Sequence, residues 1–383
     1  MKICYLAFWD SVHTHRWLKY FADKGHEVHL ISDNPRDCPE LKDVILHDLS
    51  YRGEEKLRKY LNKIYFKIRM KRLNLLLKRI KPDILHSHVA PYWGWLGANT
   101  GFHPFAITAW GSIDTANHEN SKRLKTEVEY ALKKADLITS DSGDLRQETI
   151  KLGASSLNNY IVHWGVDLNK FNQFVDNSIV KKELNLSDGD PVIISVRQFR
   201  PLYNIDIIVR AFSVVLKEVP ESKLILKNYQ GYETRRINNL VKELKIEESV
   251  RFIEKVEYKE MPKYYRAADV FVSVPSFDSM SISLLEAMAC GVIPVVSDLP
   301  ATREWIKDGE NGFLVPVRDV NALAASIIKA LKKNKEINLI RERNWNLVKH
   351  GADYYKHMER MENLYYELLN RFENKSYEKY SSV

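Results

Sequence analysis

One segment decides the fold of this chain: Val272-Ser-Val-Pro-Ser-Phe-Asp-Ser-Met-Ser-Ile-Ser-Leu-Leu-Glu-Ala-Met-Ala-Cys-Gly-Val-Ile-Pro-Val-Val-Ser-Asp298. Two apolar runs flank a polar loop and a helical pattern that ends in glycine. This order predicts a strand, a loop, a helix and a second strand. Strands that are apolar along their whole length are typical of parallel sheets covered by helices on both faces. The segment therefore predicts an α/β fold.

The same unit, a short apolar run and then a helical pattern, repeats along the 383 residues. A polar stretch between Val166 and Asp190 interrupts the repeat, and only helical patterns follow Asp319. At roughly 150 residues per domain, this length predicts two or three domains. The repeated unit and its single interruption favour two Rossmann-like, doubly wound domains facing a ligand-binding cleft. We expect domains at 1–170 and 171–350, and a terminal helix and tail at 351–383. The predicted strands are Ile3–Phe8, Val28–Ser32, Asp83–His88, Phe105–Ala109, Asp136–Ser140, Tyr160–His163, Val192–Val196, Lys223–Lys227, Val250–Ile253, Asp269–Val274 and Val292–Ser297.

The composition excludes several classes of protein. Hydrophobic residues make up 45% and charged residues 28% of the chain, which excludes a disordered or collagen-like protein. No apolar run reaches the roughly 18 residues of a membrane span, and the first residues do not resemble a signal peptide. Cys4, Cys38 and Cys290 form no CxxC pair, so we expect neither a disulfide framework nor a thiolate metal site. These features predict a protein of the reducing cytoplasm.

The net charge of +8 is concentrated in residues 54–81, which hold eleven Lys or Arg and two Glu. Apolar residues recur there at helical spacing, with lysines around them, so this helix is expected to dock on an anionic membrane. The alternative is an ordinary amphipathic helix that packs on the first domain. Nucleic acid is not expected, because no aromatic stacking platform accompanies the charge. The apolar positions are Leu57, Tyr60, Leu61, Ile64, Tyr65 and Ile68, and the lysines are Lys56, Lys59, Lys63, Lys67 and Lys71.

The candidate site lies in the segment quoted above, because doubly wound domains bind ligands at the carboxyl ends of their strands. A helix that begins near Ser279 to Ser281 would direct unpaired backbone N–H groups at a phosphate. Asp278 would lie at the mouth of this site. Glu286 follows about two helical turns later, so we expect both carboxylates on one side of the helix, facing sugar hydroxyls.

Asp278 and Glu286 also have the spacing of an E-x7-E motif, with Asp in the first place, and Leu285-Glu-Ala-Met-Ala-Cys-Gly291 follows the usual wording of that motif. By these residues the chain resembles the retaining nucleotide-sugar glycosyltransferases of family 4. That resemblance implies the two-domain GT-B fold, with a C-terminal helix that crosses back to the first domain. Further stretches that resemble the family are Pro294–Asp298, Asp308–Val315, Gly25–Val28, Pro82–His88 and Trp164–Asp167.

The resemblance implies a role for each donor-side residue. Glu286 would bind the ribose hydroxyls, and Asp278, with the N–H groups of Ser279, Met280 and Ser281, would hold the transferred hexose. Arg197 would bind the diphosphate and stabilise its departure, so that no cofactor or obligatory metal is needed. The resemblance also places Val256 at the donor.

Several residues depart from the family's pattern. Tyr203 stands where a second phosphate-binding Lys is usual, and Arg200 is the candidate replacement. Ser281 replaces a glycine. Because of these two changes, a protein that binds nucleotide sugars without turnover remains an alternative function.

The acceptor side departs from the pattern as well. A glycine-rich loop is replaced by Trp9–His15, so that His13 or His15 would act in place of bare backbone, or serve only structure. Trp110 and Ser112 stand near the position of a usual His. His86 and His88 have H-x-H spacing, which suits either a metal or residues that line the cleft.

The sequence therefore predicts a retaining hexosyltransferase that uses a nucleotide-sugar donor. A glycan or lipid-linked acceptor is expected, as in the synthesis of cell-surface polysaccharides or glycoconjugates. The location would be cytoplasmic, on the inner face of the membrane if residues 54–81 bind lipid. The alternatives are a GT-B nucleotide-sugar epimerase and a non-catalytic binding protein.

Overall fold

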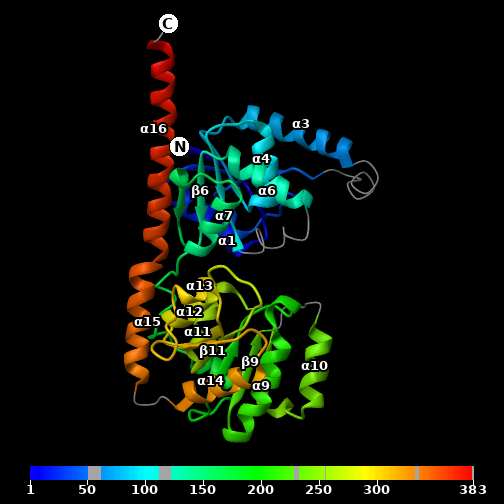
Figure 1. Ribbon diagram of the computed structural model, residues 1–383, viewed down its shortest axis with the longest axis vertical. Coiled ribbons are helices and arrows are strands. Elements are labelled where there is room, and N and C mark those ends of the chain that lie inside the picture. The colour runs from blue at the N-terminus through cyan, green and yellow to red at the C-terminus, as the bar shows by residue number, and fades with distance from the viewer. Residues whose placement is uncertain (51–61, 112–121, 228–232, 255, 333–335, 382–383) are drawn as a thin grey trace. The chain divides into compact units, whose positions relative to one another are not determined.

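The computed structural model describes residues 1–383 except 51–61, 112–121, 228–232, 255, 333–335 and 382–383. It divides into two compact units, each built on one parallel sheet (Figure 1). Met1–His163 and Lys356–Val383 form the first unit, and Trp164–Tyr355 forms the second. The predicted α/β architecture of two Rossmann-like sheets is confirmed.

The first unit has seven strands: β1 (Lys2–Leu6), β2 (Glu27–Ser32), β3 (Ile45–Asp48), β4 (Ile84–His88), β5 (Phe105–Thr108), β6 (Leu137–Ser140) and β7 (Asn159–Ile161). Their order in the sheet is β3-β2-β1-β4-β5-β6-β7. The chain therefore reverses direction across the sheet between β1 and β4, which is the switch point of a doubly wound fold. Its helices include α1 (Val12–Asp23), α3 (Asn62–Ile80), α4 (Trp95–Thr100), α6 (Lys122–Lys134) and α7 (Gly143–Lys151).

The second unit has six strands: β8 (Val192–Ser195), β9 (Lys223–Lys227), β10 (Val250–Ile253), β11 (Val270–Ser273), β12 (Ile293–Ser297) and β13 (Phe313–Val315). Their order is β10-β9-β8-β11-β12-β13, so the switch point lies between β8 and β11. Its helices are α8 (Ser178–Glu183), α9 (Ile205–Glu218), α10 (Thr234–Glu243), α11 (Met261–Arg266), α12 (Ile282–Ala289), α13 (Pro300–Arg303), α14 (Val320–Lys332) and α15 (Ile337–Gly351).

The last helix, α16 (Tyr354–Ser381), packs on the first unit from Lys356 onward (Figure 1). Its Tyr365 hydroxyl lies 3.1 Å from that of Tyr5 in β1, and Glu362 accepts hydrogen bonds from His26 and Tyr20. The predicted return of the C-terminal helix to the first domain is therefore confirmed. Among the described residues, no helix combines the length and hydrophobicity needed to cross a membrane.

The unit boundary falls seven residues before the expected end of the first domain at residue 170. Val166 exchanges backbone hydrogen bonds with Ala352 and Tyr354, which joins the segment after Trp164 to the second unit. Two strands, β3 and β13, are absent from the predicted set. Both are short and lie at sheet edges, and β3 is only partly buried, so neither has a long apolar run to mark it.

The structure describes the predicted apolar face of the basic helix only from Asn62 onward, and in that part Tyr65 and Ile68 are half-buried. Ile64 is 49% exposed. The buried face of α3 holds Met70, Leu73, Leu77 and Ile80. The predicted positions Leu57, Tyr60 and Leu61 lie outside the described residues, as do Lys56 and Lys59.

Arg69 also lies on the buried face of α3. Its side chain is 3% exposed and pairs with Asp33 at 2.7 Å. Tyr65 accepts a second hydrogen bond at 2.8 Å, and the guanidinium lies 5.1 Å from the ring centroid of Tyr92. Such a buried, paired cation is part of the packing and is not available to a membrane.

Candidate active site

Two neighbouring strand ends at the switch point of the second sheet are joined by Arg197, which follows β8. Its Nε donates to the Ser273 hydroxyl at the end of β11 at 2.9 Å. Its Nη2 pairs with the Asp278 carboxylate in the loop after β11. These two side chains are only 15% and 19% exposed, so solvent screens the ion pair less than a surface pair. The structure thus brings Arg197 and Asp278 together.

Tyr203 takes part in the same cluster, although it replaces a lysine of the family. The Arg197 guanidinium lies 5.0 Å from the centroid of its ring, within the range of a cation–π interaction. Burial lowers the pKa of Arg197 from its ordinary value, and Tyr203 and Tyr265 act in the opposite direction. The Arg200 side chain is exposed, and Val256 packs half-buried against the core of this unit. Tyr203 therefore stabilises the Arg197 guanidinium through its aromatic ring.

α12 begins directly after this cluster. Ser281 is its N-cap, and its hydroxyl accepts a hydrogen bond from the Leu284 backbone N–H. Gly291 ends the helix at a φ of +79°, with hydrogen bonds from Gly291 to Met288 and from Val292 to Ala287. This is the Schellman pattern, which favours glycine at that position.

The cap corrects one expectation about the two carboxylates. Asp278 precedes the first turn of α12, so helical spacing does not align it with Glu286. Its pairing with Arg197 positions it instead. The Met280 side chain is 5% exposed and belongs to the core, so only its backbone could meet a ligand, which is the role predicted for it. Ser279 is also buried.

Glu286 is a buried carboxylate, 3% exposed, that is held by two tyrosines. The Tyr258 hydroxyl donates to Oε1 at 2.6 Å and the Tyr265 hydroxyl to Oε2 at 3.1 Å. Burial and the nearby Glu286 raise the pKa of Tyr265 far above its ordinary value, which keeps its hydroxyl a donor. A carboxylate only accepts hydrogen bonds, so Glu286 suits hydroxyl donors such as those of these two tyrosines.

Sequence reasoning missed Tyr258, Tyr265 and Lys227. The tyrosines belong to η7 (Tyr258–Glu260) and α11, which carry no motif. Lys227 is the last residue of β9. A basic residue at the end of an apolar strand could have identified it as a site residue. Burial lowers the pKa of Lys227, and the charge of Glu286 raises it, so the two side chains interact electrostatically.

Comparison with known families decides the assignment. A family model described as "Glycosyl transferases group 1" matches residues 176–346, and one described as "Glycosyl transferase 4-like" matches residues 2–142. The chain belongs to the family 4 glycosyltransferases. The first match covers most of the unit that carries Arg197 and Glu286, and the second covers most of the other unit.

Individual relatives of this glycosyltransferase are distant. N-acetyl-alpha-D-glucosaminyl L-malate synthase of Bacillus anthracis is 25% identical over 370 residues, which covers 93% of each protein. D-inositol 3-phosphate glycosyltransferase of Geodermatophilus obscurus is 27% identical over 274 residues, or 66% of this chain and 60% of its own. The crystal structure of Anabaena Alr3699/HepE in complex with UDP-glucose superposes with a TM-score of 0.80 at 16% identity, covering 96% of this chain and all of that one. This likeness shows the shared GT-B fold.

Three of the residues predicted for the acceptor side lie close together in the first unit of the glycosyltransferase. The ring centroids of His13 and Trp110 lie 6.0 Å apart, and those of His88 and Trp110 lie 5.7 Å apart. His15 has a different neighbour, the Trp9 carbonyl oxygen. Ser112 lies outside the described residues.

His86 lies beside this group and is fixed by structural partners. Its Nε2 lies 2.8 Å from the Thr108 hydroxyl, and its Nδ1 contacts the Tyr365 hydroxyl of α16. The ring centroids of His86 and His88 are 5.0 Å apart. Both histidines are fully buried. Of the two readings of the H-x-H pair, these partners favour a strand-end packing role for His86.

This buried group predicts an acid-sensitive fold. Burial lowers the pKa of His88 to about 3, with His13 adding to the effect, against about 6.5 in the unfolded chain. Below pH 6.5 the unfolded state therefore binds the proton more readily than the folded state. The contribution of His88 to the free energy of unfolding is fully present above that pH and is lost as the pH is lowered. We expect His88 alone to cost about 2 kcal/mol between pH 7 and pH 5.

Urea unfolding at the two pH values measures this loss. In His88→Asn the dependence on pH should be weaker, whereas His350→Asn, at an exposed site, should retain the full dependence. If the free energy of unfolding falls equally between pH 7 and pH 5 in His88→Asn and in the unchanged protein, His88 does not cause the acid sensitivity.

Proposed function

We propose that this glycosyltransferase moves a hexose from a nucleotide sugar to a hydroxyl acceptor with retention of configuration. The observation that carries the proposal is the buried Glu286 carboxylate, held by two tyrosines at the switch point of the second sheet. A buried acceptor of this kind selects paired hydroxyls, such as those of ribose, over a bare phosphate. UDP is the first nucleotide to test, because the similar Anabaena protein binds UDP and UDP-glucose.

The Arg197 cluster would stabilise the leaving group. Ser273 and Asp278 each occupy one N–H donor of Arg197, which leaves three of its five for phosphate oxygens. As the bond between the anomeric carbon and the phosphate oxygen breaks, its electron pair moves onto the diphosphate, where the guanidinium and the N-terminus of α12 oppose the growing negative charge.

Asp278, held by Arg197, and the backbone N–H groups of Ser279 to Ser281 would orient the hexose. Retention follows if the acceptor oxygen bonds to the anomeric carbon on the face that the diphosphate leaves, and the acceptor proton passes to the departing phosphate oxygen. No step in this scheme requires a metal or another cofactor. The scheme assigns Arg197 the role that a metal ion has in other transferases.

A donor panel tests this function. UDP-, GDP- and ADP-sugars are incubated with the purified protein in buffer with EDTA and in buffer with Mg²⁺, and the release of nucleoside diphosphate is measured. We expect slow hydrolysis of one donor class without acceptor, nearly independent of EDTA. Epimerised nucleotide sugar would support the epimerase, and tight binding without turnover would support the binding protein. NMR of the glycoside product, once an acceptor is found, checks its anomeric configuration.

A glycan or lipid-linked acceptor of cell-surface polymers remains our proposal. The named relatives favour a second candidate, a small anionic acceptor, because their printed names contain L-malate and inositol 3-phosphate. Offering each class to the enzyme with its preferred donor separates the two. Transfer to malate or inositol phosphate, and not to a lipid-linked glycan, would replace the first proposal.

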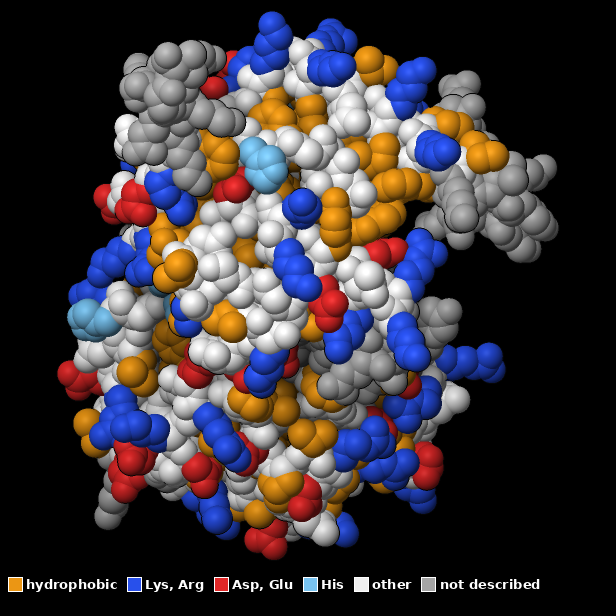
Figure 2. All heavy atoms as spheres, turned by 45° about the horizontal axis from the view of Figure 1, so that its top comes forward, with side chains coloured by type: hydrophobic (Ala, Val, Ile, Leu, Met, Phe, Trp, Pro, Cys, Tyr) orange, Lys and Arg blue, Asp and Glu red, His pale blue; other side chains and the backbone are white. Residues whose placement is uncertain are grey.

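We propose that α3 carries a membrane-binding surface, which would bring the enzyme to a lipid-linked acceptor. A groove of about 490 Å³ lies along this helix, lined by three lysines, Asn74 and three hydrophobic residues, Phe66, Met70 and Leu75. Figure 2 shows Lys and Arg side chains beside hydrophobic side chains on the face in view. The surface lysines Lys67, Lys71 and Lys78 replace buried Arg69 as the groups that would meet anionic headgroups and hold the enzyme on the inner face of the membrane.

Flotation with liposomes tests this surface. At roughly 1 kcal/mol per lysine, changing all three to Gln should weaken binding to anionic vesicles about a hundredfold. High salt should weaken it as well. The matched control changes three exposed lysines of the second unit to Gln: Lys217, Lys242 and Lys307. Equal binding to neutral and anionic vesicles, or equal loss in the control, would leave α3 as scaffold.

A further inference from the structure

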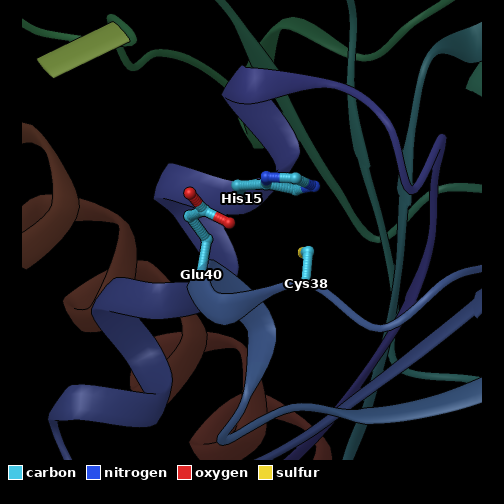
Figure 3. Close-up of side chains that lie close together, drawn as sticks. All are labelled: His15, Cys38 and Glu40. Atoms are coloured by element: carbon cyan, nitrogen blue, oxygen red, sulfur yellow. The ribbon is translucent and has the colours of Figure 1, made fainter. Parts of the chain in front are cut away.

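A group of metal-binding side chains lies in the first unit, apart from every residue used above for donor chemistry. One ligand atom each from His15, Cys38 and Glu40 lies within 4.8 Å of the other two. His15 comes from the first turns of α1, and Cys38 and Glu40 come from the segment at η1 (Pro39–Leu41). Figure 3 shows the three side chains directed toward a common space.

The surroundings of His15 suit a metal ligand. Its Nε2 lies at the carbonyl oxygen of Trp9, an acceptor that holds the ring proton on Nε2. The lone pair then remains on Nδ1. A ligating histidine usually donates its second ring nitrogen to a carbonyl or carboxylate in this way, which fixes both tautomer and orientation.

Cys38 and Glu40 form a preset pair on one short turn. Pro39 between them fixes its own φ near −65°, which limits how far the two side chains can separate. Burial raises the pKa of the Cys38 thiol, the backbone N–H of Leu41 acts in the opposite direction, and Glu40 raises it further.

We propose that His15, Cys38 and Glu40 bind one Zn²⁺ ion. A thiolate with an imidazole selects Zn²⁺ over Mg²⁺ or Ca²⁺, and three protein ligands leave the fourth tetrahedral position to water. Bonds of 2.0–2.3 Å place tetrahedral ligand atoms roughly 3.3–3.8 Å apart. From the limit of 4.8 Å, the ligand atoms need to approach one another by at most about 1.0–1.5 Å, a change within the reach of side-chain rotation. The thiol proton leaves to solvent as the sulfur–zinc bond forms.

The ion would tie the start of α1 to the segment that follows β2. This gives His15 a role in positioning α1, in place of the acceptor contact considered from the sequence. It also replaces the expectation that no cysteine of this chain serves a metal. The site would stabilise the first unit, and the proposal does not depend on which sugar is transferred.

Cobalt substitution tests the site in the full-length protein. Protein stripped of metal by a chelator is titrated with Co²⁺ under reducing conditions, and its absorption spectrum is recorded. We expect one Co²⁺ per chain, with the intense visible bands of a tetrahedral site and a thiolate-to-cobalt charge-transfer band in the near ultraviolet. Zn²⁺ should displace the cobalt and raise the thermal midpoint.

Variants assign the ligands. Cys38→Ser should remove the charge-transfer band, and His15→Ala and Glu40→Gln should each weaken Co²⁺ binding about a hundredfold or more, since even outer-shell partners are worth ten- to a hundredfold. Asp37→Asn, an exposed carboxylate next to Cys38, is the matched control and should bind normally. Glu40 is exposed, so its variant should fold even if the others do not. A band that persists in Cys38→Ser, a purely octahedral spectrum, or equal affinity in Glu40→Gln would overturn the proposal.

Discussion

Replacing Glu286 by Gln or Ala is expected to reduce kcat/KM for the nucleotide-sugar donor about ten- to a hundredfold. In the proposed binding mode, each change removes a charge-assisted hydrogen bond to the donor ribose worth roughly 1.5–3 kcal/mol. Steady-state kinetics with the preferred donor, together with the Kd of the free nucleoside diphosphate, measures the effect. Because the ribose is bound in both the ground state and the transition state, we expect nucleotide affinity and kcat/KM to fall together.

Two further variants locate this effect at the carboxylate. Tyr258→Phe removes one of the hydroxyls that hold Glu286 and should cause a smaller loss of the same kind. Glu260→Gln is the matched control, a partly exposed carboxylate whose partner is Lys263. If Glu286→Gln has a native circular dichroism spectrum and unchanged kinetics, the ribose assignment is wrong.

Replacing Arg197 by Ala is expected to lower kcat about a hundredfold, with a smaller change in KM. The guanidinium opposes negative charge that grows only as the diphosphate departs, so the loss falls mainly on the transition state. Single-turnover measurements at saturating donor separate this chemical step from binding. Arg197→Lys should recover only part of the rate, because an ammonium group cannot bond Ser273, Asp278 and a phosphate with the same fork geometry.

Arg236→Ala is the matched control for this change. Arg236 is half-exposed and pairs with Asp206 and Glu233 in the same unit, so its loss removes an equal charge at a surface ion pair. An equal drop in kcat in both variants would indicate a general effect of charge. A change confined to KM in Arg197→Ala would contradict its role in leaving-group departure.

Local pattern was sufficient to predict most of the sheet. Eleven of the thirteen strands in the described part of the chain follow apolar runs, because a strand buried on both faces must be apolar along its length. β3 and β13 were missed because both are short, with four and three residues, and β3 is only partly buried. The two ends of α12 could also be predicted, because Ser281 and Gly291 in the same segment form hydrogen bonds with its terminal backbone groups.

The partners of the site residues could not be predicted in the same way. Nothing near Glu286 in the sequence indicates that Tyr258 and Tyr265 hold it, since they reach it from η7 and α11. Arg69 has the sequence context of a surface charge, and only the structure shows that it is buried and paired with Asp33, from the loop after β2. Such contacts join residues far apart in the chain, so no local spacing encodes them.

The sequence by itself determined the α/β class, the positions of the buried strands, the caps of α12 and the motif that marks the family, because each depends on residues within one segment. Only the tertiary structure decided that Arg197 pairs with Asp278, which face of α3 is buried, and that His15 meets Cys38 and Glu40. The physical reason is that a side chain's partner is set by how packed elements bring distant residues together, whereas periodicity and capping act within a few turns of one element.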